Sequence, residues 1–243
     1  MNNSIDTIPL INLSLAFIPA ILTIGILFRW SLNSTNALYA ISRMLIQLLL
    51  FGYFLTYIFD SDSAGVVVLI LAVMVMVSSW IALGTIPDLR MQLYKYALIA
   101  IMVGGGVTLA MITQGVLMLD PWYSPQSMIP IAGMIFANAM NSVSLCAERL
   151  SAELGRYVPY DEARKIALQS SLIPVTNALF AVGLVSLPGM MTGQILSGVS
   201  PLIAVRYQIM VMCMVFGASG IASAYFLVLV RPAFEKKLAD LND

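Results

Sequence analysis

Long apolar runs alternate with short polar connections over the whole chain. Runs long enough to cross the hydrocarbon core of a bilayer, which is about 30 Å thick, occupy residues 8–28, 37–59, 64–86, 97–119, 128–147, 173–196 and 204–230. The connections carry turn-forming residues such as Pro87-Asp88 and Asp120-Pro121. The pattern predicts an all-α, polytopic integral membrane protein with about seven transmembrane helices.

The composition also indicates a chain that lies in lipid. Hydrophobic residues make up 60% of it and charged residues 10%, whereas about 25% of residues are charged in an average soluble domain. We expect a single transmembrane domain over residues 1–243, with a short cytoplasmic segment at about 148–172. No basic residue precedes the first apolar run, so this run is expected to remain as a span and not to be a cleaved signal peptide.

The basic residues predict the orientation, because cytoplasmic connections of membrane proteins retain Lys and Arg. With the N-terminus outside, eleven of the 12 basic residues lie at or near the inner face, and Arg206 lies outside. An odd number of spans then places the C-terminus in the cytoplasm. Trp122 and Tyr123 are expected at the outer interface, where amphipathic rings are favoured.

Several classes of enzyme are excluded by residues that the chain does not have. It contains no histidine, which removes serine triads, a histidine base and imidazole metal ligands. None of its lysines is followed by Ser or Thr, so there is no phosphate-binding loop, and ATP hydrolysis is not expected in this chain. No basic face for nucleic acid is found. We therefore expect a protein that is not an enzyme and holds no cofactor of its own.

The 16 methionines are best explained as flexible apolar packing residues in lipid. The alternative is a path for a soft metal ion, since thioether sulfur binds such ions. The residues that this alternative would use are Met190, Met191, Met210, Met212 and Met214.

Polar residues inside the predicted spans are candidates for a translocation path, because a charge at mid-membrane costs about 2.5 to 3.5 kcal/mol on insertion scales. Arg43 lies in the second run with Gln47 one turn later, although the Arg43 head group could also reach the cytoplasmic interface. In the fifth run, an arc of about 120° at 100° per residue holds four polar residues that either line a path or join helices through hydrogen bonds. They are Asn138, Asn141, Ser144 and Glu148.

The sixth run is interrupted at Pro188-Gly189 and continues to Gln194. Proline removes a backbone donor, and glycine admits unusual backbone angles. A break at membrane depth frees backbone groups that must face protein or water, as in the substrate sites of transporters. The alternative is an ordinary helix end at the outer face.

The densest charge lies between the fifth and sixth runs. Residues 148–165 hold a third of the charged residues, and Pro159 followed by Asp161 and Glu162 predicts a helix start with acids in its first turn. Such a helix could transmit the motion of an ATPase, whereas the simpler alternative is a solvated loop. Small residues follow at helical spacing and form a face that would fit a groove of another protein: Ala163, Ile166, Ala167 and Ser170.

Small residues also predict close contacts between helices. Gly104-Gly105-Gly106 would either loosen the fourth run or let a neighbouring helix approach closely. Pairs at four-residue spacing predict further contacts, within the chain or in a dimer: Gly133 with Ala137, and Gly220 with Ala224.

Three motifs between residues 128 and 212 are specific enough to compare with known permeases. They are Met128 to Met134 (MIPIAGM) with Asn138-Ala139-Met140, Gly183 to Thr192 (GLVSLPGMMT) with Gly193 and Gln194, and Ser200-Pro201 with Ala204 to Met210 (AVRYQIM). Arg43 with Ile46-Gln47 and Gly52-Tyr53 add to them. On these residues the chain resembles the FetB-like permeases, also called YbbM, which have plant aluminium-tolerance membrane subunits as relatives.

The resemblance implies the membrane-spanning permease subunit of an ATP-binding-cassette transporter, with ATP and Mg²⁺ bound by a separate cytoplasmic ATPase. Bacterial members look like iron exporters, and plant members are associated with export of nucleotide sugars. Iron or another metal ion is therefore the expected cargo, and a nucleotide sugar is the alternative. We also expect a homodimer in a plasma membrane, the inner membrane of a bacterium.

Two groups of candidate residues follow from these observations. The substrate pathway is expected to use Arg43, Gln47, Asn138, Asn141, Pro188, Gly189 and Gln194. Coupling to the ATPase is expected to use Glu148, Glu153, Gly155, Asp161, Glu162, Arg164 and Lys165.

The metal ligands stay unknown, because no span centre offers the cluster of Asp, Glu or His that Fe²⁺ would favour. A second class of function is a stand-alone secondary transporter driven by an ion gradient, against which stands the lack of a mid-membrane acidic pair. A third is an intramembrane enzyme, which needs paired acids or a metal cluster.

Overall fold

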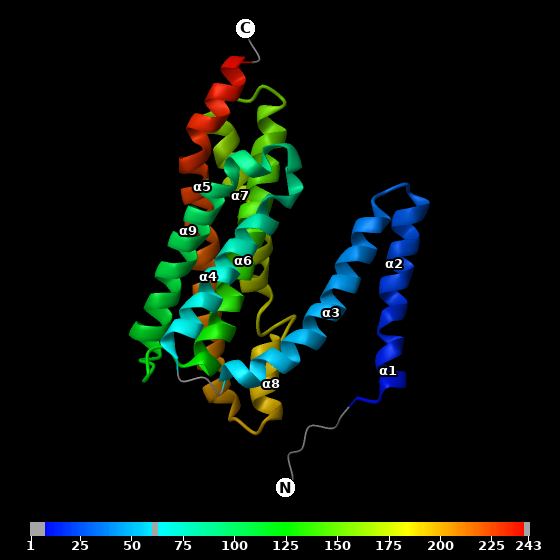
Figure 1. Cartoon of the computed structure of the whole chain (residues 1–243), viewed down its shortest axis with the longest axis vertical. Coiled ribbons are helices and arrows are strands. Elements are labelled where there is room, and N and C mark those ends of the chain that lie inside the picture. The colour runs from blue at the N-terminus through cyan, green and yellow to red at the C-terminus, as the bar shows by residue number, and fades with distance from the viewer. Residues whose placement is uncertain (1–7, 60–62, 241–243) are drawn as a thin grey trace. The chain divides into compact units, whose positions relative to one another are not determined.

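The computed structural model describes residues 8–59 and 63–240 (Figure 1). Regular structure in these residues is helical, apart from one isolated bridge between Val182 and Ser186. The predicted all-α fold class is therefore confirmed. In chain order the helices are α1 (Leu10–Leu15), α2 (Phe17–Arg29), α3 (Ser34–Phe59), α4 (Ala64–Ala82), η1 (Leu83–Thr85), η2 (Pro87–Leu89), α5 (Arg90–Ala110), the π-helical η3 (Met111–Val116), α6 (Pro125–Leu154), α7 (Tyr160–Ala181), α8 (Gly189–Leu196) and α9 (Pro201–Asp240).

Six helical segments in the described part of the chain are long and apolar enough to cross a membrane. They match six of the seven predicted runs, and their ends differ because the helices continue beyond the apolar stretch into polar residues. The six segments are Leu10–Arg29, Ser34–Phe59, Ala64–Thr85, Pro87–Val116, Pro125–Leu154 and Pro201–Phe234.

The run predicted at 173–196 is wrong in its position. α7 ends at Ala181, the chain is non-helical up to Pro188, and α8 begins only at Gly189. The return crossing is made by α7, which begins at Tyr160 and runs back along the bundle in contact with α6 and α9 (Figure 1). Charged residues in its first turns lower its average hydropathy, so a search for apolar runs finds the crossing too late. With α7, which is not among the six apolar candidates, the described residues contain seven long helical segments, so the predicted count of about seven holds approximately.

The contacts divide the chain into two compact units. The first contains α1 to α3, in which α2 and α3 form a helical hairpin with exposed apolar side chains such as Leu22, Phe28 and Leu49. Exposed apolar side chains of this kind are suited to lipid or to other helices. The second unit is the bundle of α4 to α9 and holds the core. A single domain over residues 1–243 stays a prediction.

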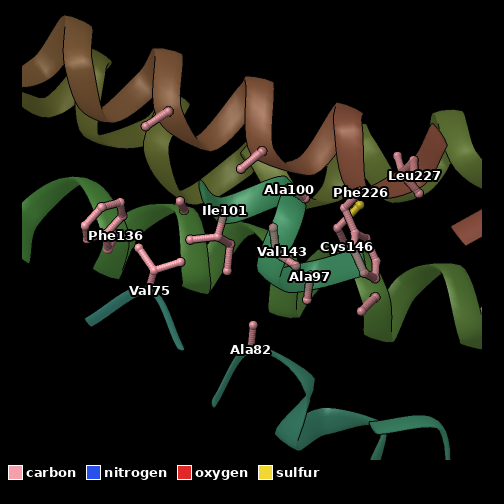
Figure 2. Close-up of a cluster of buried hydrophobic side chains, with 14 of the residues drawn as sticks. Val75, Ala82, Ala97, Ala100, Ile101, Phe136, Val143, Cys146, Phe226 and Leu227 are labelled. Atoms are coloured by element: carbon pink, nitrogen blue, oxygen red, sulfur yellow. The ribbon is translucent and has the colours of Figure 1, made fainter. Parts of the chain in front are cut away.

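The core of the bundle is built by α4, α5, α6, α7 and α9. Figure 2 shows part of it, with Val75 from α4, Ile101 from α5, Phe136 from α6 and Phe226 from α9. The most extensive contact joins α5 and α9, two helices that are far apart in the sequence. The positions of α5 and α9 therefore depend on each other.

Two glycines, which have no side chain beyond Cα, allow this close contact between α5 and α9. A Cβ atom built on Gly104 would lie 2.6 Å from the backbone nitrogen of Ala222 in α9, and one on Gly105 would lie 2.7 Å from the Phe136 ring. Without a hydrophobic driving force between helices in lipid, such close packing is a main source of their association. The predicted role of the glycine triplet is thus confirmed at Gly104 and Gly105, whereas Gly106 faces open space.

The two small-residue pairs differ from the glycine triplet, because no neighbouring backbone lies close to their glycines. A Cβ atom on Gly220 would meet nothing within 4 Å, and one on Gly133 would meet only the Cε of Met74, at 3.6 Å. The described residues thus show no close backbone approach at these pairs, and a contact between two copies of the chain stays a prediction. Spacing alone shows that a helix has a narrow face, and the tertiary structure decides whether a neighbour lies against it.

Basic residues gather at one end of the bundle. Arg90 begins α5, Arg149 and Arg156 lie at the end of α6, and Arg231 lies near the end of α9. Arg206 lies in the second turn of α9, at the opposite end, where the connection with Trp122 and Tyr123 also lies (Figure 1). By the distribution of basic residues, the first end faces the cytoplasm, which places the C-terminal end of α9 there.

We expect Gly104→Ala to destabilise the protein, because its methyl group would displace the backbone of α9 and not the end of a flexible side chain. Overpacking of this kind typically costs about 1 to 3 kcal/mol. Thermal unfolding of the purified protein in detergent is the measurement. Gly106→Ala, which meets open space, is the matched control and should unfold at the same temperature or slightly higher, since alanine favours helix. Equal losses in both variants would contradict the close α5–α9 contact.

Candidate functional site

A partly open cavity of about 290 Å³ lies among α6, α7 and α9, with a largely apolar wall that carries several polar side chains. Its polar lining residues come from all three helices, and Pro188 from the segment before α8 also lines it. Asn138 lies near the middle of the 30-residue helix α6, so the cavity is at mid-depth, where transporters bind their substrates. The polar side chains in its wall are Asn138, Asn141, Ser142, Ser171 and Gln208.

The hydrogen bonds of the wall leave oxygen acceptors toward the cavity. The Asn138 side-chain amide donates one hydrogen bond to the carbonyl oxygen of Met134, at 2.8 Å, which leaves its second N–H and its Oδ1. The Ser171 hydroxyl donates to the carbonyl oxygen of Leu168, at 2.8 Å, and keeps its lone pairs. Gln208 is 5% exposed, and its Oε1 has no partner. An unpartnered buried acceptor is costly to keep, so Gln208 is the most informative residue of the site.

A second cavity, of about 430 Å³, lies beside the first toward the outer end. Met134 lines both cavities. Together they follow one face of α6 from Gln126 to Leu145, a rise of about 28 Å at 1.5 Å per residue. This length matches the hydrocarbon thickness of a bilayer. The face of α6 is therefore long enough to line a path across the membrane.

Both cavities also lie beside a proline inside a helix. Pro130 of α6 lines the outer cavity, and Pro174 of α7 lines the inner one. Proline has no N–H, so each leaves the carbonyl oxygen four residues earlier, that of Gln126 or of Ser170, without its helical donor. In lipid such freed groups are tolerated where protein or a water-filled cavity satisfies them.

The structure brings together three of the predicted pathway residues, Asn138, Asn141 and Pro188, in the wall of the inner cavity. Gly189 and Gln194 lie in α8 and line neither cavity, although the Oε1 of Gln194 is also buried without a partner. Arg43 and Gln47 lie in α3, in the other compact unit.

The polar face of α6 differs from the predicted arc. Asn138 and Asn141 line the cavity, but Ser144 and Glu148 do not. Ser142 and Leu145 take their place in the wall. Sequence reasoning also missed Gln208 and Ser171. Gln208 was detectable, because it is a polar residue inside an apolar run, whereas Ser171 was not, because its place in a span depended on where α7 begins.

A buried carboxylate, that of Glu153, lies at the cytoplasmic end of α6. Glu153 accepts ion pairs from Arg149, at 2.7 Å, and from Arg156, at 3.4 Å, and its side chain is 6% exposed. A tight turn follows, in which the Val158 amide donates to the Glu153 carbonyl oxygen, at 3.2 Å. Glu153 thus stabilises the α6–α7 turn. Its carboxylate is buried, and the side chains of Arg149 and Arg156 are exposed to solvent.

α7 is fastened to α9 at the same end. The Tyr160 hydroxyl donates to the carbonyl oxygen of Leu227. The Arg231 guanidinium lies 5.5 Å from the centre of the Tyr160 ring and 3.5 Å from the Asp161 carboxylate. Asp161 also pairs with Arg164, at 3.2 Å. These contacts join the first turn of α7 to α9.

The other residues predicted to couple with an ATPase lie at this end. Glu148, Gly155, Glu162 and Lys165 are exposed, and Arg164 is half-buried. The helix start predicted after Pro159 is confirmed, since α7 begins at Tyr160 with Asp161 and Glu162 in its first turn.

The predicted small-residue face of α7 is wrong as a docking face for another protein. Ala163 and Ala167 are fully buried in the core of this chain. The small side chains do fit a groove, but the groove belongs to the same bundle.

These features define a class of protein: a multi-pass, all-α membrane protein with a cavity at mid-depth whose wall carries polar side chains, and a charged cytoplasmic end. Residues 10–159 and 156–234 match the family described as "Uncharacterised protein family (UPF0014)". The chain belongs to this family of membrane proteins. No solved structure matches it.

Similar proteins come from bacteria and plants. The chain is 35% identical over 206 residues to the UPF0014 membrane protein slr1647 of Synechocystis, covering 78% of this chain and 80% of that protein. It is 34% identical over 203 residues to the "Probable iron export permease protein FetB" of Escherichia coli, covering 77% of each. It is 30% identical over 240 residues to the protein ALUMINUM SENSITIVE 3 of Arabidopsis thaliana, covering 91% of this chain and 86% of that protein. The family resemblance seen in the sequence motifs is confirmed.

We expect Glu153→Gln to lower the thermal stability of the purified protein by about 1 to 3 kcal/mol, because a buried hydrogen-bonded carboxylate loses its charge. The value lies toward the lower end, since Arg149 and Arg156 are partly solvated and screened. Glu148→Gln is the matched control on the same helix, exposed and without an ion pair in the described residues. A Glu148→Gln variant that loses as much stability as Glu153→Gln would contradict the structural role of Glu153.

Proposed function

We propose that this protein is the membrane-spanning permease subunit of an ATP-binding-cassette exporter. The observation that carries the proposal is the connection between the mid-depth cavity and the exposed charged end through one helix. α7 holds Glu162 and Lys165 at the cytoplasmic end and Ser171 and Pro174 in the cavity wall. About 14 Å of helix separates Lys165 from Pro174 at 1.5 Å per residue.

This connection gives a path for mechanical coupling. A cytoplasmic ATPase that grips the first turn of α7 would also move α9, because Tyr160 and Asp161 fasten the two helices together. α9 carries Gln208 and Val211 in the opposite wall of the cavity. Motion at the charged end would therefore move the α7 and α9 walls of the cavity together relative to its α6 wall, a change of the kind that alternating access requires.

The proposed cargo is iron or another metal ion. Support comes from the Escherichia coli relative, whose name describes a probable iron export permease, and from the lining of the cavity, which contains no Lys or Arg to bind the phosphates of a nucleotide sugar. ATP and Mg²⁺ would be bound by the separate ATPase. Two copies of the permease in the inner membrane of a bacterium would form the complete path.

We expect Fe²⁺ to raise the rate of ATP hydrolysis when this chain and its ATPase partner are placed together in liposomes. The physical reason is that cargo in the cavity favours the arrangement of α7 and α9 that the ATP-bound partner requires. The measurement is phosphate release with and without Fe²⁺, and liposomes with the ATPase alone are the control.

Two results would reject parts of the proposal. Stimulation by a nucleotide sugar, with no response to Fe²⁺, would reject the metal cargo and keep the exporter. Uphill Fe²⁺ flux through this chain without any ATPase would reject the exporter and indicate a secondary transporter driven by an ion gradient.

A further inference from the structure

We infer that the inner cavity binds a divalent cation with its water shell intact, through hydrogen bonds from the waters to neutral oxygen atoms of the protein, chief among them Oε1 of Gln208. This inference rests on the proposed function and names how the cargo is held. No protein atom replaces a water on the ion. The protein recognises an octahedral array of outward-pointing O–H donors.

The free groups of the cavity wall suit such a ligand. One amide hydrogen of Asn138 and the hydroxyl hydrogen of Ser171 are engaged with backbone carbonyl groups, while the Asn138 Oδ1 and the lone pairs of the Ser171 oxygen remain as acceptors. Gln208 contributes a buried Oε1 without a partner. Waters polarised by a divalent cation are strong donors, and hydrogen bonds to charged donors are stronger than neutral ones.

Direct coordination is poorly supported by the same wall. None of its side chains is charged, and the described residues contain no group of three or more His, Cys, Asp or Glu that could hold a metal ion. Small divalent cations such as Mg²⁺ lose water reluctantly and keep several waters in most protein sites. A few neutral amides cannot replace a complete shell, whereas they can accept hydrogen bonds from it.

The size of the cavity agrees with a hydrated ion. Six waters occupy about 180 Å³ at their share of the liquid volume, and the cavity measures about 290 Å³. A bare ion would leave most of this space empty. Weak contacts through water also suit an exporter, because the cargo must leave when the walls move.

Substitution of Gln208 can distinguish a role in binding from a role in stabilising the fold. A residue kept for packing or helix contacts would have its polar atoms satisfied, and its loss would destabilise the fold. Oε1 of Gln208 is instead buried without a hydrogen-bond partner in the protein, so its loss of hydration is not compensated. Leucine of similar size should therefore leave the fold as stable as before, or more stable, while cargo binding is lost. Such opposite effects are expected for a binding residue.

The experiment uses the full chain in lipid nanodiscs without an ATPase, with Mn²⁺ as the probe. Electron–nuclear double resonance counts the waters on bound Mn²⁺, and a titration gives its affinity. Hexaamminecobalt(III), which resembles a hexahydrated cation but cannot exchange its ligands, is the competitor. Gln208→Leu is the test variant, and Gln92→Leu, which makes the same change at an exposed site that lines neither cavity, is the matched control.

We expect bound Mn²⁺ to keep six waters and to be displaced by hexaamminecobalt(III). Gln208→Leu should weaken binding about tenfold or more without lowering the unfolding temperature, and Gln92→Leu should bind like the unchanged chain. Gln208→Glu keeps the acceptor and adds charge, so it should bind Mn²⁺ more tightly. This variant also decides the case if Gln208→Leu does not fold.

Any of four results would overturn the inference: no binding of Mn²⁺, fewer than six waters on the bound ion, no competition by hexaamminecobalt(III), or unchanged affinity in the Gln208 variants. Because these measurements need no ATPase, they are separate from the test of the proposed function. If the chain binds the hydrated ion but never stimulates an ATPase, the inferred site is supported and the proposed exporter function is rejected.

Discussion

The constraint on which this structure depends is that polar groups inside a bilayer must find their partners within the protein. The backbone meets it by forming helices through all the crossings. Small polar side chains meet it locally, since Ser79, Thr108 and Thr113 donate to carbonyl oxygens of their own helices. Against this background an unpartnered buried oxygen is informative. Gln208 has one, and it lies in the wall of a cavity where Asn138 and Ser171 donate to carbonyl oxygens of their own helices.

The same constraint explains the dual character of α7. Its first turns are charged and lie at the cytoplasmic end, where Asp161 pairs with Arg164 and Arg231. Its second half carries few polar groups and contributes to the cavity wall. A helix that is solvated at one end and lines a membrane cavity further along joins the two environments rigidly. The contact of Tyr160 with α9 extends this connection to a second wall of the cavity.

Close packing sets the position of the remaining helices. Gly104 lets α5 lie against the backbone of α9, and the core side chains of α4 and α6 fill the space around this pair. α9 is thus held by α5 along its length and by α7 near its cytoplasmic end. A bundle fastened in this way can transmit a movement from the charged end to mid-depth without a separate hinge in α9.

The sequence by itself determined the all-α class, six of the crossings, the charged end and the family, because hydropathy and the distribution of basic residues act through each segment alone. It also identified Asn138, Asn141 and Pro188, which are unusual for their surroundings in the chain. Only the tertiary structure decided where α7 crosses, that Ala163 and Ala167 pack inside the bundle, and that Ser171 and Gln208 meet Asn138. These depend on which helix faces are neighbours, and a face of small or polar residues does not specify its partner until the helices pack in three dimensions.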